Sequence, residues 1–556
     1  MLNHLTKVLW VGVLVLCTVP AFAQTVDTAW VRRYDGPANR HDDARGLAVD
    51  DSGNVYVTGE SKGTLVPTNP SDYATIKYLP NGDTAWVRRY NGPEESEDRA
   101  SALAIDGSGN VYVTGYSLSS TTLKDYATVK YLSDGDTAWV RRYDVPGGGD
   151  DYARAIVVDA SGNVYVTGYS VGCWGNTDIV TIKYQPDGAT GWEAIFGGTG
   201  NGWDGGSAIA VDGTGGVYVT GYAVGFGTDE DYVTIKYSSE GGDWRTYDGP
   251  ADSTDVGLAI AVDGSGNVYV TGRSIGSGTS YDYATIKYLP DGDTAWVRRY
   301  NGTGNDWDEA GAVAADNFGN VYVTGRSTGS GTSYDYATIK YLPDGDTAWV
   351  RRYNGQGNGY DQATAIAVDN SGNVYVTGAS TGSGTGLDFA TIKYLANGDT
   401  GWVIRYDGSA SGDEAAVSIA VDDSGNVYVT GWSQNSEGYE DYCTIKYVQT
   451  PSEVKDETGD REKPSEFNLS QNYPNPFNPT TKIEFTLAKS GFVTLQIYDV
   501  LGRKVRTLVS QELSSAYKSV IWDGKNEDGK EVASGVYFYQ LRVGDFSQPR
   551  KMILLK

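Results

Sequence analysis

Side chains that could act as nucleophile, general base or zinc ligand are few in this sequence. The 556 residues include only two histidines, His4 and His41. His41 lies in the polar stretch Asn39-Arg-His-Asp-Asp43, with no nucleophile motif beside it. A Ser-His-Asp or Cys-His system needs a histidine base, and a zinc site needs several His or Cys ligands. We therefore interpret His41 as a loop residue and predict neither kind of site.

The cysteines give no redox or structural framework. Cys17 lies in the apolar stretch at the N-terminus, and Cys173 and Cys443 lie far apart in the chain. A disulfide between the last two is not expected, so disulfide bonds do not hold this fold.

Acidic residues, by contrast, recur at one fixed position. An acid stands eight residues before the Asp that ends each expected first strand of the repeat described below, and we call this set the acidic ring: Asp42, Asp98, Asp151, Asp204, Asp255, Asp308, Asp361 and Glu414. Carboxylate oxygens suit calcium, so such a ring could collect cations. Alternatively, each carboxylate accepts backbone N–H bonds and holds its own turn. Repetition in every unit favours this second interpretation. No other cofactor is expected.

Aromatic residues stand beside this ring in only some repeats. Trp203, Trp307 and Tyr360 come directly before their acid, and Tyr152 directly follows Asp151. The equivalent position before the acid holds His41, Glu97, Thr254 or Asp413 in other repeats. Aromatic faces in polar loops stack on sugars, so these four aromatic residues could form a glycan-binding platform. Packing between adjacent loops is the alternative.

A long internal repeat must position these residues. The phrase Gly266-Asn-Val-Tyr-Val-Thr-Gly272, or a close variant of it, occurs eight times, with its central tyrosine at Tyr56, Tyr112, Tyr165, Tyr218, Tyr269, Tyr322, Tyr375 and Tyr428. The spacing is 53 residues in five of seven intervals. A period of this length is typical of a propeller or a solenoid.

Each repeat contains four short strand candidates. In the fifth repeat they are Leu258–Asp263, Asn267–Gly272, Tyr283–Tyr288 and Ala295–Tyr300, rich in Val, Ile, Thr, Tyr and Trp and separated by Gly- and Asp-rich turns. Four strands in about 50 residues are typical of a propeller blade. The repeats begin with a fourth-type strand, Thr28–Tyr34, and end with a third-type strand, Tyr442–Tyr447. The first strand can therefore complete the last blade. The sequence predicts an all-β, eight-bladed propeller over residues 24–449, with a β-solenoid as the alternative.

The two ends of the chain differ from the repeats. Residues 1–23 have Lys7, an apolar run and the small-x-small pattern Ala21-Phe-Ala23, as in a secretory signal peptide. The apolar run is short for a membrane anchor, and we expect no transmembrane segment in the mature chain. Residues 450–466 are charged and are predicted to be a linker. Residues 467–556 show a new alternating pattern that predicts a small antiparallel sandwich.

Two resemblances follow from these motifs. Residues 27–448 resemble the bacterial seven-bladed β-propeller repeat family, on Gly-Asn-Val-Tyr-Val-Thr-Gly and Tyr-Ala-Thr-Ile-Lys-Tyr, although eight copies are present. Residues 467–556 resemble the type A sorting domain of type IX secretion, on Gln471–Thr480, Ile497–Gly502, Trp522–Gly524, Ser534–Tyr537 and Lys551–Lys556. That resemblance implies an immunoglobulin-like fold, the secretion machinery as a partner, and passage through the periplasm to the cell surface or medium. The related immunoglobulin-like domain of flagellar hook assembly proteins shares the Ser-Gly-Val-Tyr part.

Composition and charge narrow the function further. The net charge of −27 disfavours nucleic acid and anionic membranes as partners. We expect a secreted or cell-surface binding scaffold for a glycan or a protein, without catalysis. The alternatives are a secreted polysaccharide hydrolase or lyase that uses carboxylates at the channel mouth, and a passive surface protein or adhesin. An asymmetric pair of acids with raised pKa near the axis would favour the enzyme.

Overall fold

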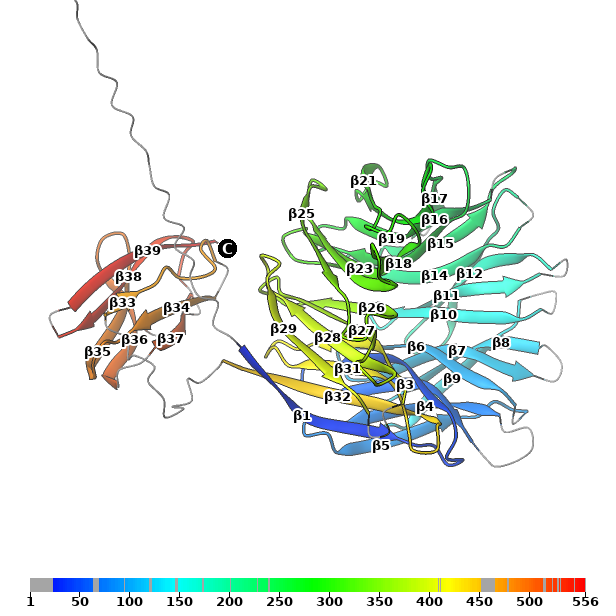
Figure 1. Cartoon of the computed structure of the whole chain (residues 1–556), viewed down its shortest axis with the longest axis horizontal. Helices are drawn as coiled ribbons and strands as arrows, with labels where there is room; N and C mark the ends of the chain where they lie inside the picture. Colours follow the sequence, from blue (N-terminus) through cyan, green and yellow to red (C-terminus); the bar gives the residue numbers. More distant parts are fainter. Residues whose placement is uncertain are drawn as a thin grey trace, which may run out of the picture. The chain divides into compact units, whose positions relative to one another are not determined.

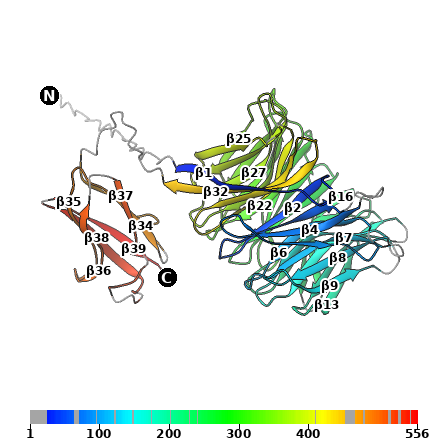
Figure 2. The ribbon, with the colours of Figure 1, turned by 90° about the horizontal axis from the view of Figure 1, so that it is seen from below.

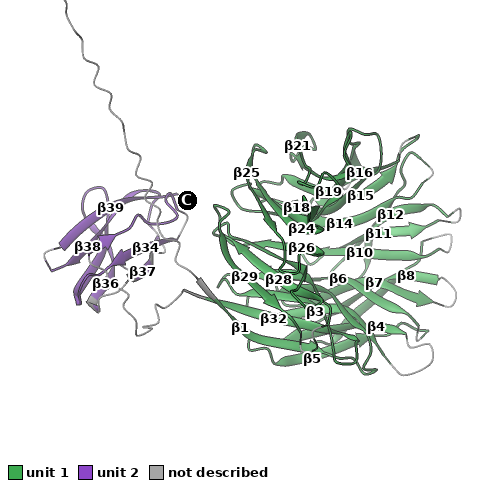
Figure 3. Cartoon of the chain, viewed as in Figure 1, with its two compact units in different colours: residues 1–453 green, residues 454–556 purple. Residues whose placement is uncertain are grey.

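The structure is a computed structural model, and it describes most of residues 24–555. It leaves out 1–23, 64–69, 95, 120–122, 146–148, 173–174, 201, 228, 239–240, 409, 411, 452–465, 478–479, 514–516, 523, 528–529, 531, 545 and 556. The predicted signal peptide, Cys173 and most of the predicted linker lie outside the described residues. The chain divides into two compact units, Met1–Glu453 and Val454–Lys556 (Figure 3).

The first unit is an eight-bladed propeller, as the sequence predicts. Eight antiparallel sheets of four strands follow one another along the chain (Figure 1). Blades 1 to 4 are formed by β2 (Asp42–Val49), β3 (Val55–Lys62), β4 (Ser71–Tyr78) and β5 (Thr84–Tyr90); β6 (Asp98–Ile105), β7 (Val111–Ser119), β8 (Leu123–Tyr131) and β9 (Thr137–Tyr143); β10 (Asp151–Val158), β11 (Val164–Val171), β12 (Thr177–Tyr184) and β13 (Thr190–Phe196); and β14 (Gly205–Val211), β15 (Val217–Val224), β16 (Glu230–Ser238) and β17 (Gly241–Tyr247). Blades 5 to 8 are formed by β18 (Asp255–Val262), β19 (Val268–Ile275), β20 (Tyr281–Tyr288) and β21 (Thr294–Tyr300); β22 (Asp308–Ala315), β23 (Val321–Thr328), β24 (Tyr334–Tyr341) and β25 (Thr347–Tyr353); β26 (Asp361–Val368), β27 (Val374–Thr381), β28 (Leu387–Tyr394) and β29 (Thr400–Tyr406); and β30 (Glu414–Val421), β31 (Val427–Gln434), β32 (Glu440–Pro451) and β1 (Gln24–Tyr34). The first strand of each blade contacts the first strands of both neighbouring blades, so these eight strands are the innermost.

The first, innermost strand of each blade begins earlier than the sequence predicts. In blade 5 the first strand begins at Asp255, three residues before the predicted start at Leu258. A β-bulge between Gly257 and Ala259 lies in this added part, and the same irregularity occurs in the first strand of every blade. The acidic ring therefore lies at the start of the innermost strands rather than in the loops before them. Only Asp204 stands one residue ahead of its strand, β14.

Turn chemistry explains why each blade repeats so regularly. In blade 1 the carboxylate of Asp50, at the turn after β2, accepts the backbone N–H groups of Ser52 and Asn54 at 3.0 and 2.9 Å. Its other oxygen accepts the Asn54 side-chain amide at 2.7 Å and the Tyr56 hydroxyl at 2.9 Å. Gly53 completes this turn with a φ of 77°, in a region that glycine adopts readily. These bonds involve only neighbouring residues, so each Asp-x-x-Gly-Asn phrase builds its own hairpin.

Side chains that recur in the repeat also join neighbouring blades. Trp296 in blade 5 donates its indole N–H to the carbonyl of Pro343 in blade 6 at 3.2 Å. Lys287 lies over the ring of Tyr269, 5.5 Å from its centroid, and donates to the same carbonyl at 3.0 Å. The ammonium group of Lys287 thus binds a backbone carbonyl of the next blade, whose turn lies within reach.

The ring closes between the two ends of the propeller sequence. β1 pairs with β32 in antiparallel register from Gln24–Pro451 to Tyr34–Tyr442, and both views show the two strands side by side (Figures 1 and 2). The N-terminal strand thus supplies the fourth strand of blade 8 and covers the edge that β32 would otherwise expose.

The second unit is an immunoglobulin-like sandwich. One sheet consists of β33 (Asn468–Leu469), β34 (Thr481–Thr486) and β37 (Tyr517–Trp522), and the other of β36 (Lys504–Leu513), β35 (Gly491–Tyr498), β38 (Gly535–Val543) and β39 (Phe546–Leu554). Trp522, Tyr539 and Leu541 are buried in its core. Across the described part of the chain, no helix is long and apolar enough to cross a membrane.

Candidate functional site

The side chains of the acidic ring are buried, and most of their carboxylates accept hydrogen bonds from backbone N–H groups. Asp42 accepts the N–H of Gly36 at 2.6 Å, in the loop before β2, and the N–H of Lys62 at 3.0 Å, at the end of β3. The equivalent acids of blades 6 and 7 repeat this arrangement: Asp308 binds the N–H groups of Gly302 and Thr328. Each such carboxylate fastens the inter-blade loop to the second strand of its own blade. This is the role in turn structure that the sequence left as the alternative to a cation ring.

Burial raises the pKa of every member of the acidic ring. The pKa of Asp42, Asp98 and Asp151 is raised to about 6, chiefly by loss of hydration. The pKa of Glu414 is raised to about 7 by burial, with further contributions from the nearby charges of Asp407 and Asp388. The remaining ring acids shift in the same direction: Asp204, Asp255, Asp308 and Asp361.

The aromatic residues predicted beside the ring do not form one platform. Trp307 and Tyr360 take part in one group of side chains at the border of blades 5, 6 and 7, which we call the Trp307 cluster: Arg273, Tyr281, Trp307, Glu309, Arg326, Tyr334 and Tyr360. Tyr152 lies in a second group, and Trp203 in neither.

Two arginines hold the Trp307 cluster together. The ring centroids of Tyr281 and Trp307 are 4.6 Å apart. Arg273 and Arg326 both lie over the Trp307 ring, at 5.6 and 5.5 Å from its centroid. Both guanidinium groups also pair with the carboxylate of Glu309, at 2.5 and 3.2 Å. Both guanidinium groups therefore contact the indole and share one carboxylate.

The cluster continues into blade 7. Arg326 lies over the ring of Tyr334, 5.1 Å from its centroid, and donates to the Tyr360 hydroxyl at 3.5 Å. The rings of Tyr334 and Tyr360 meet edge to face at 5.7 Å. The indole N–H of Trp307 and the Nε–H of Arg273 have no hydrogen-bond partner among the described residues. Aromatic faces and unused donors thus occur together in one sector of the propeller.

Tyr152 belongs to a second cluster, in blades 2 and 3. Its ring stacks on Tyr169 at 5.0 Å and meets Tyr116 edge to face at 5.1 Å. Lys124 lies over both Tyr116 and Tyr152 and donates to the Tyr152 hydroxyl at 3.1 Å. Trp203, in blade 4, is 63% exposed and has no aromatic partner among the described residues.

An asymmetric acid pair lies in blade 1. Asp43, the second residue of β2, faces Glu60 across the β2–β3 pair, and both carboxylates contact Arg45 at 3.2 Å. Burial raises the pKa of Asp43 to about 6, and the charges of Glu60 and Glu440 raise it further against the effect of Arg45. His41 pairs with Glu440 on β32. Other blades place different residue types at the position of Asp43, such as Arg99 and Gln362.

Sequence reasoning missed the charged members of these clusters. Arg273, Arg326 and Glu309 occupy the second position of a first strand or its partner on the second strand, as in the Glu309–Arg326 pair. At this pair of positions the residue type changes from blade to blade, while the surrounding motif stays constant. That contrast in variability was the available signal.

Comparisons with known proteins agree with this architecture. The Beta-propeller repeat model matches residues 30–65, 85–120, 138–172, 243–278, 348–384 and 408–438. The FlgD Ig-like domain model matches residues 473–544. A curated relative is the uncharacterized WD repeat-containing protein L264 of Acanthamoeba polyphaga mimivirus, 21% identical over 445 residues. The alignment covers 64% of this chain and 31% of that protein, so the chain spans about a third of its relative's length.

Several solved structures align with this chain, each at a TM-score below 0.5. PorZ, a surface component of the type IX secretion system of Porphyromonas gingivalis, is 16% identical with a TM-score of 0.37, over 92% of this chain and 70% of PorZ. The WD40 domain of SCAP from fission yeast is 9% identical with a TM-score of 0.43, over 77% and 99% of the two chains. A polysaccharide lyase of the ulvan lyase family is 11% identical with a TM-score of 0.36, over 75% and 96%. This chain therefore has the fold of a β-propeller joined to an immunoglobulin-like domain, with matches to the Beta-propeller repeat and FlgD Ig-like domain models over the residues given above.

Proposed function

We propose that this protein is a secreted or cell-surface scaffold whose propeller binds a glycan through the Trp307 cluster. One observation carries the proposal. The repeat motif is nearly constant around the ring, but the Trp307 cluster occurs in one sector only. Residues that serve the fold recur in every blade, as the eight buried tyrosines of the second strands do, whereas a binding site breaks the symmetry of its scaffold.

The chemistry of the cluster suits a carbohydrate. The half-buried indole of Trp307 and the phenol rings of Tyr281 and Tyr360 offer apolar faces to sugar C–H groups. Arg273 and Glu309 offer a donor and an acceptor for hydroxyl groups. The test must distinguish glycan binding from binding of a protein partner and from a passive surface role.

The test is a glycan-array and polysaccharide-binding screen of the mature chain. We compare Trp307→Ala with Phe318→Ala, which removes an aromatic ring that is 70% exposed in the turn at the other end of β22. Loss of one stacking contact should weaken binding about tenfold or more, which corresponds to at least about 1.4 kcal/mol, and Phe318→Ala should bind as the parent does. Binding that is unaffected by Trp307→Ala would refute the site. The lack of any glycan ligand would shift the proposal to a protein partner.

We further propose that the C-terminal unit directs export through type IX secretion. The signal-peptide pattern of residues 1–23 and the motifs of residues 467–556 support this route. Deletion of residues 467–556 should leave the propeller in the periplasm of a host that has the type IX machinery, while the full chain reaches the surface or medium. Surface delivery of the deleted chain would contradict the proposal. The screen above uses purified protein, so the two tests fail independently.

A second candidate function is cleavage of a polysaccharide by Asp43 and Glu60. It is favoured by the raised pKa of Asp43 in an acid pair that other blades lack. The assay is release of new chain ends from any polysaccharide that binds. Asp43→Asn should abolish turnover, while Asp51→Asn, an exposed acid in the turn at the far end of β2, should not. Binding without turnover in the parent protein would rule this function out.

A further inference from the structure

Three acidic side chains converge at four of the blade borders. One oxygen of each lies within 4.8 Å of the others in the groups Asp35–Asp42–Asp441, Asp125–Asp144–Asp151, Asp231–Asp248–Asp255 and Asp388–Asp407–Glu414. Each group combines a member of the acidic ring, the acid that directly follows the fourth strand of the preceding blade, and an acid near the start of that blade's third strand. These groups therefore form at particular blade borders and not at every member of the acidic ring.

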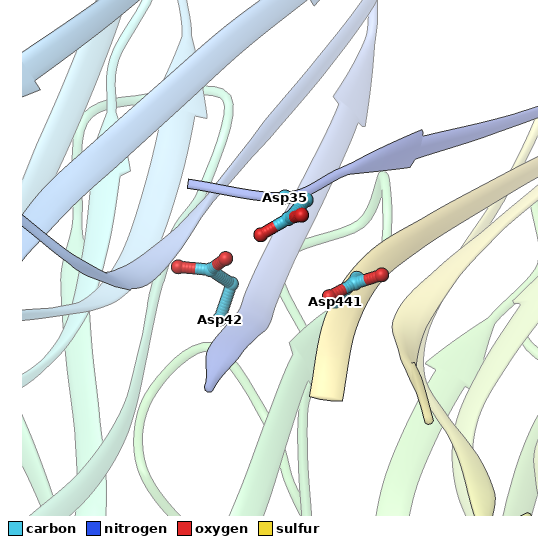
Figure 4. A group of neighbouring side chains, drawn as sticks. All are labelled: Asp35, Asp42 and Asp441. Carbon is cyan, nitrogen blue, oxygen red and sulfur yellow. The ribbon is translucent and has the colours of Figure 1, made fainter. Parts of the chain in front are cut away.

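In the first of these groups, the two buried carboxylates already have hydrogen-bond partners. Figure 4 shows Asp35, Asp42 and Asp441 around the closure of the ring. Both oxygens of Asp42 accept backbone N–H groups. Asp441 pairs with Arg33 through one oxygen at 3.1 Å and accepts the Asn435 amide through the other at 3.1 Å. Hydrogen bonds therefore satisfy its two buried carboxylates without a further ligand.

The group Asp388–Asp407–Glu414 differs in this respect. Asp388 and Glu414 are 3% and 0% exposed. Asp388 binds Arg405 through Oδ2 at 2.6 Å, and Glu414 accepts the Ser433 hydroxyl through Oε1 at 3.1 Å. The other oxygen of each, Oδ1 of Asp388 and Oε2 of Glu414, is buried without a hydrogen-bond partner among the described residues. A buried carboxylate oxygen without a donor is costly, so these two call for a ligand with positive charge.

Charge and geometry indicate which ligand fits. The three carboxylates carry three negative charges and Arg405 one positive charge, which leaves two negative charges for a divalent cation to balance. Calcium binds carboxylate oxygens at about 2.3–2.6 Å, so two of its ligands can lie up to about 5 Å apart. The separation of at most 4.8 Å meets this limit. Asp407 is exposed, so water can reach the ion and complete its shell of about six to eight oxygens.

We propose that a calcium ion binds between Asp388, Asp407 and Glu414 and joins blade 7 to blade 8. Asp388 lies on β28 and Asp407 directly after β29, both in blade 7, whereas Glu414 begins β30 of blade 8. The ion thereby links the last complete repeat to the blade that closes the ring. This site is separate from the Trp307 cluster and does not depend on the proposed glycan binding.

The experiment measures calcium binding to the mature chain after treatment with a chelator. Equilibrium dialysis gives the bound calcium, and the thermal unfolding midpoint with and without calcium gives its effect on stability. Asp407→Asn removes one ligand at the surface, so the variant should fold. Asp399→Asn is the matched control, because it removes an exposed acid at the other end of the same strand, β29.

We expect the parent and Asp399→Asn to bind calcium alike and to unfold at a higher temperature in its presence. Asp407→Asn should lose one equivalent of bound calcium or bind it at least about tenfold more weakly, since it removes a charged ligand. Two results would overturn the proposal. One is a parent protein that binds no calcium, which would leave a shared proton to neutralise the group. The other is undiminished binding by Asp407→Asn, which would place the ion elsewhere.

Discussion

Replacing Trp30 by alanine should weaken the closure of the propeller ring. Trp30 lies on β1, the N-terminal strand that completes blade 8, and its side chain is 7% exposed. Its indole N–H donates to the carbonyl of Pro80 in blade 1 at 3.1 Å. Its ring lies 6.0 Å from that of Tyr78 and 6.5 Å from that of Tyr428, centroid to centroid. The residue therefore joins the last blade to the first.

The size of the effect follows from burial. A buried tryptophan removes about 200 Å² from water, which corresponds to about 5 kcal/mol at about 25 cal/mol per Å². Tryptophan-to-alanine changes in protein cores cost about 3–5 kcal/mol, and this range includes the lost hydrogen bond of about 1 kcal/mol. We expect Trp30→Ala to lower the free energy of unfolding of the propeller by about 4 kcal/mol.

An equivalent tryptophan in a blade away from the closure supplies the matched control. Trp349 is 8% exposed, and its indole N–H donates to the carbonyl of Ala396 in the next blade at 3.4 Å. Unfolding of both variants is followed by far-ultraviolet circular dichroism in a denaturant titration. If β1 stabilises the propeller as much as the fourth strand of any other blade does, the two variants should lose similar amounts of free energy of unfolding. A loss below about 1 kcal/mol for Trp30→Ala, with the full loss for Trp349→Ala, would show that β1 does not carry the closure.

Three further predictions concern packing, pH and reactivity. Gly325→Ala should destabilise the propeller by about 3 kcal/mol or more, because a Cβ there would lie 2.0 Å from the carbonyl oxygen of Glu309. Gly311→Ala is the control, because the nearest atom to its Cβ would be 3.9 Å away. This variant should be close to neutral in the same denaturation assay. The pKa of Asp98 is raised to about 6 by burial, so the folded chain binds this proton at a higher pH than the unfolded chain does, and stability should rise as pH falls through 6 toward 4. Asp98→Asn should reduce that rise in calorimetric scans between about pH 7.5 and about pH 5, and an unchanged slope would show that Asp98 does not titrate in this range. Burial raises the pKa of the Cys443 thiol to about 12, so iodoacetamide should modify it only after denaturation, as read by mass spectrometry of its peptide; rapid labelling of the folded chain would contradict its burial.

The fold could be predicted from the sequence because its determinants are local and repeated. The hairpin built by Asp50, Gly53 and Asn54 depends on residues within one turn. Each blade repeats the same phrase, so counting phrases counts blades. The strand types at the two ends of the repeats predict the pairing of β1 with β32, because a propeller needs every blade complete. The exact extent of the first strands was not predicted, because their added residues depend on a bulge and on contacts with neighbouring blades.

The candidate site was predictable only in part. The sequence drew attention to Trp203, Trp307, Tyr360 and Tyr152, because they break the repeat. It could not tell that Trp307 and Tyr360 would both contact Arg326, that Tyr152 would stack on Tyr169, or that Trp203 would have no aromatic partner among the described residues. These contacts cross blade borders, and side chains at equivalent repeat positions reach different neighbours as the residues around them change.

What the sequence by itself determined is the backbone: eight blades, a closed ring and a separate sandwich, all specified by turn residues and strand periodicity within each segment. What only the tertiary structure decided is the state of individual side chains. Every member of the ring is an acid in the sequence, but Asp42 has both oxygens bonded to backbone N–H groups, whereas one oxygen of Glu414 is buried without a donor among the described residues. The physical reason is that hydrogen bonding and burial depend on atoms brought in from other strands and blades, to within a few tenths of an ångström, and no spacing along the chain encodes that precision.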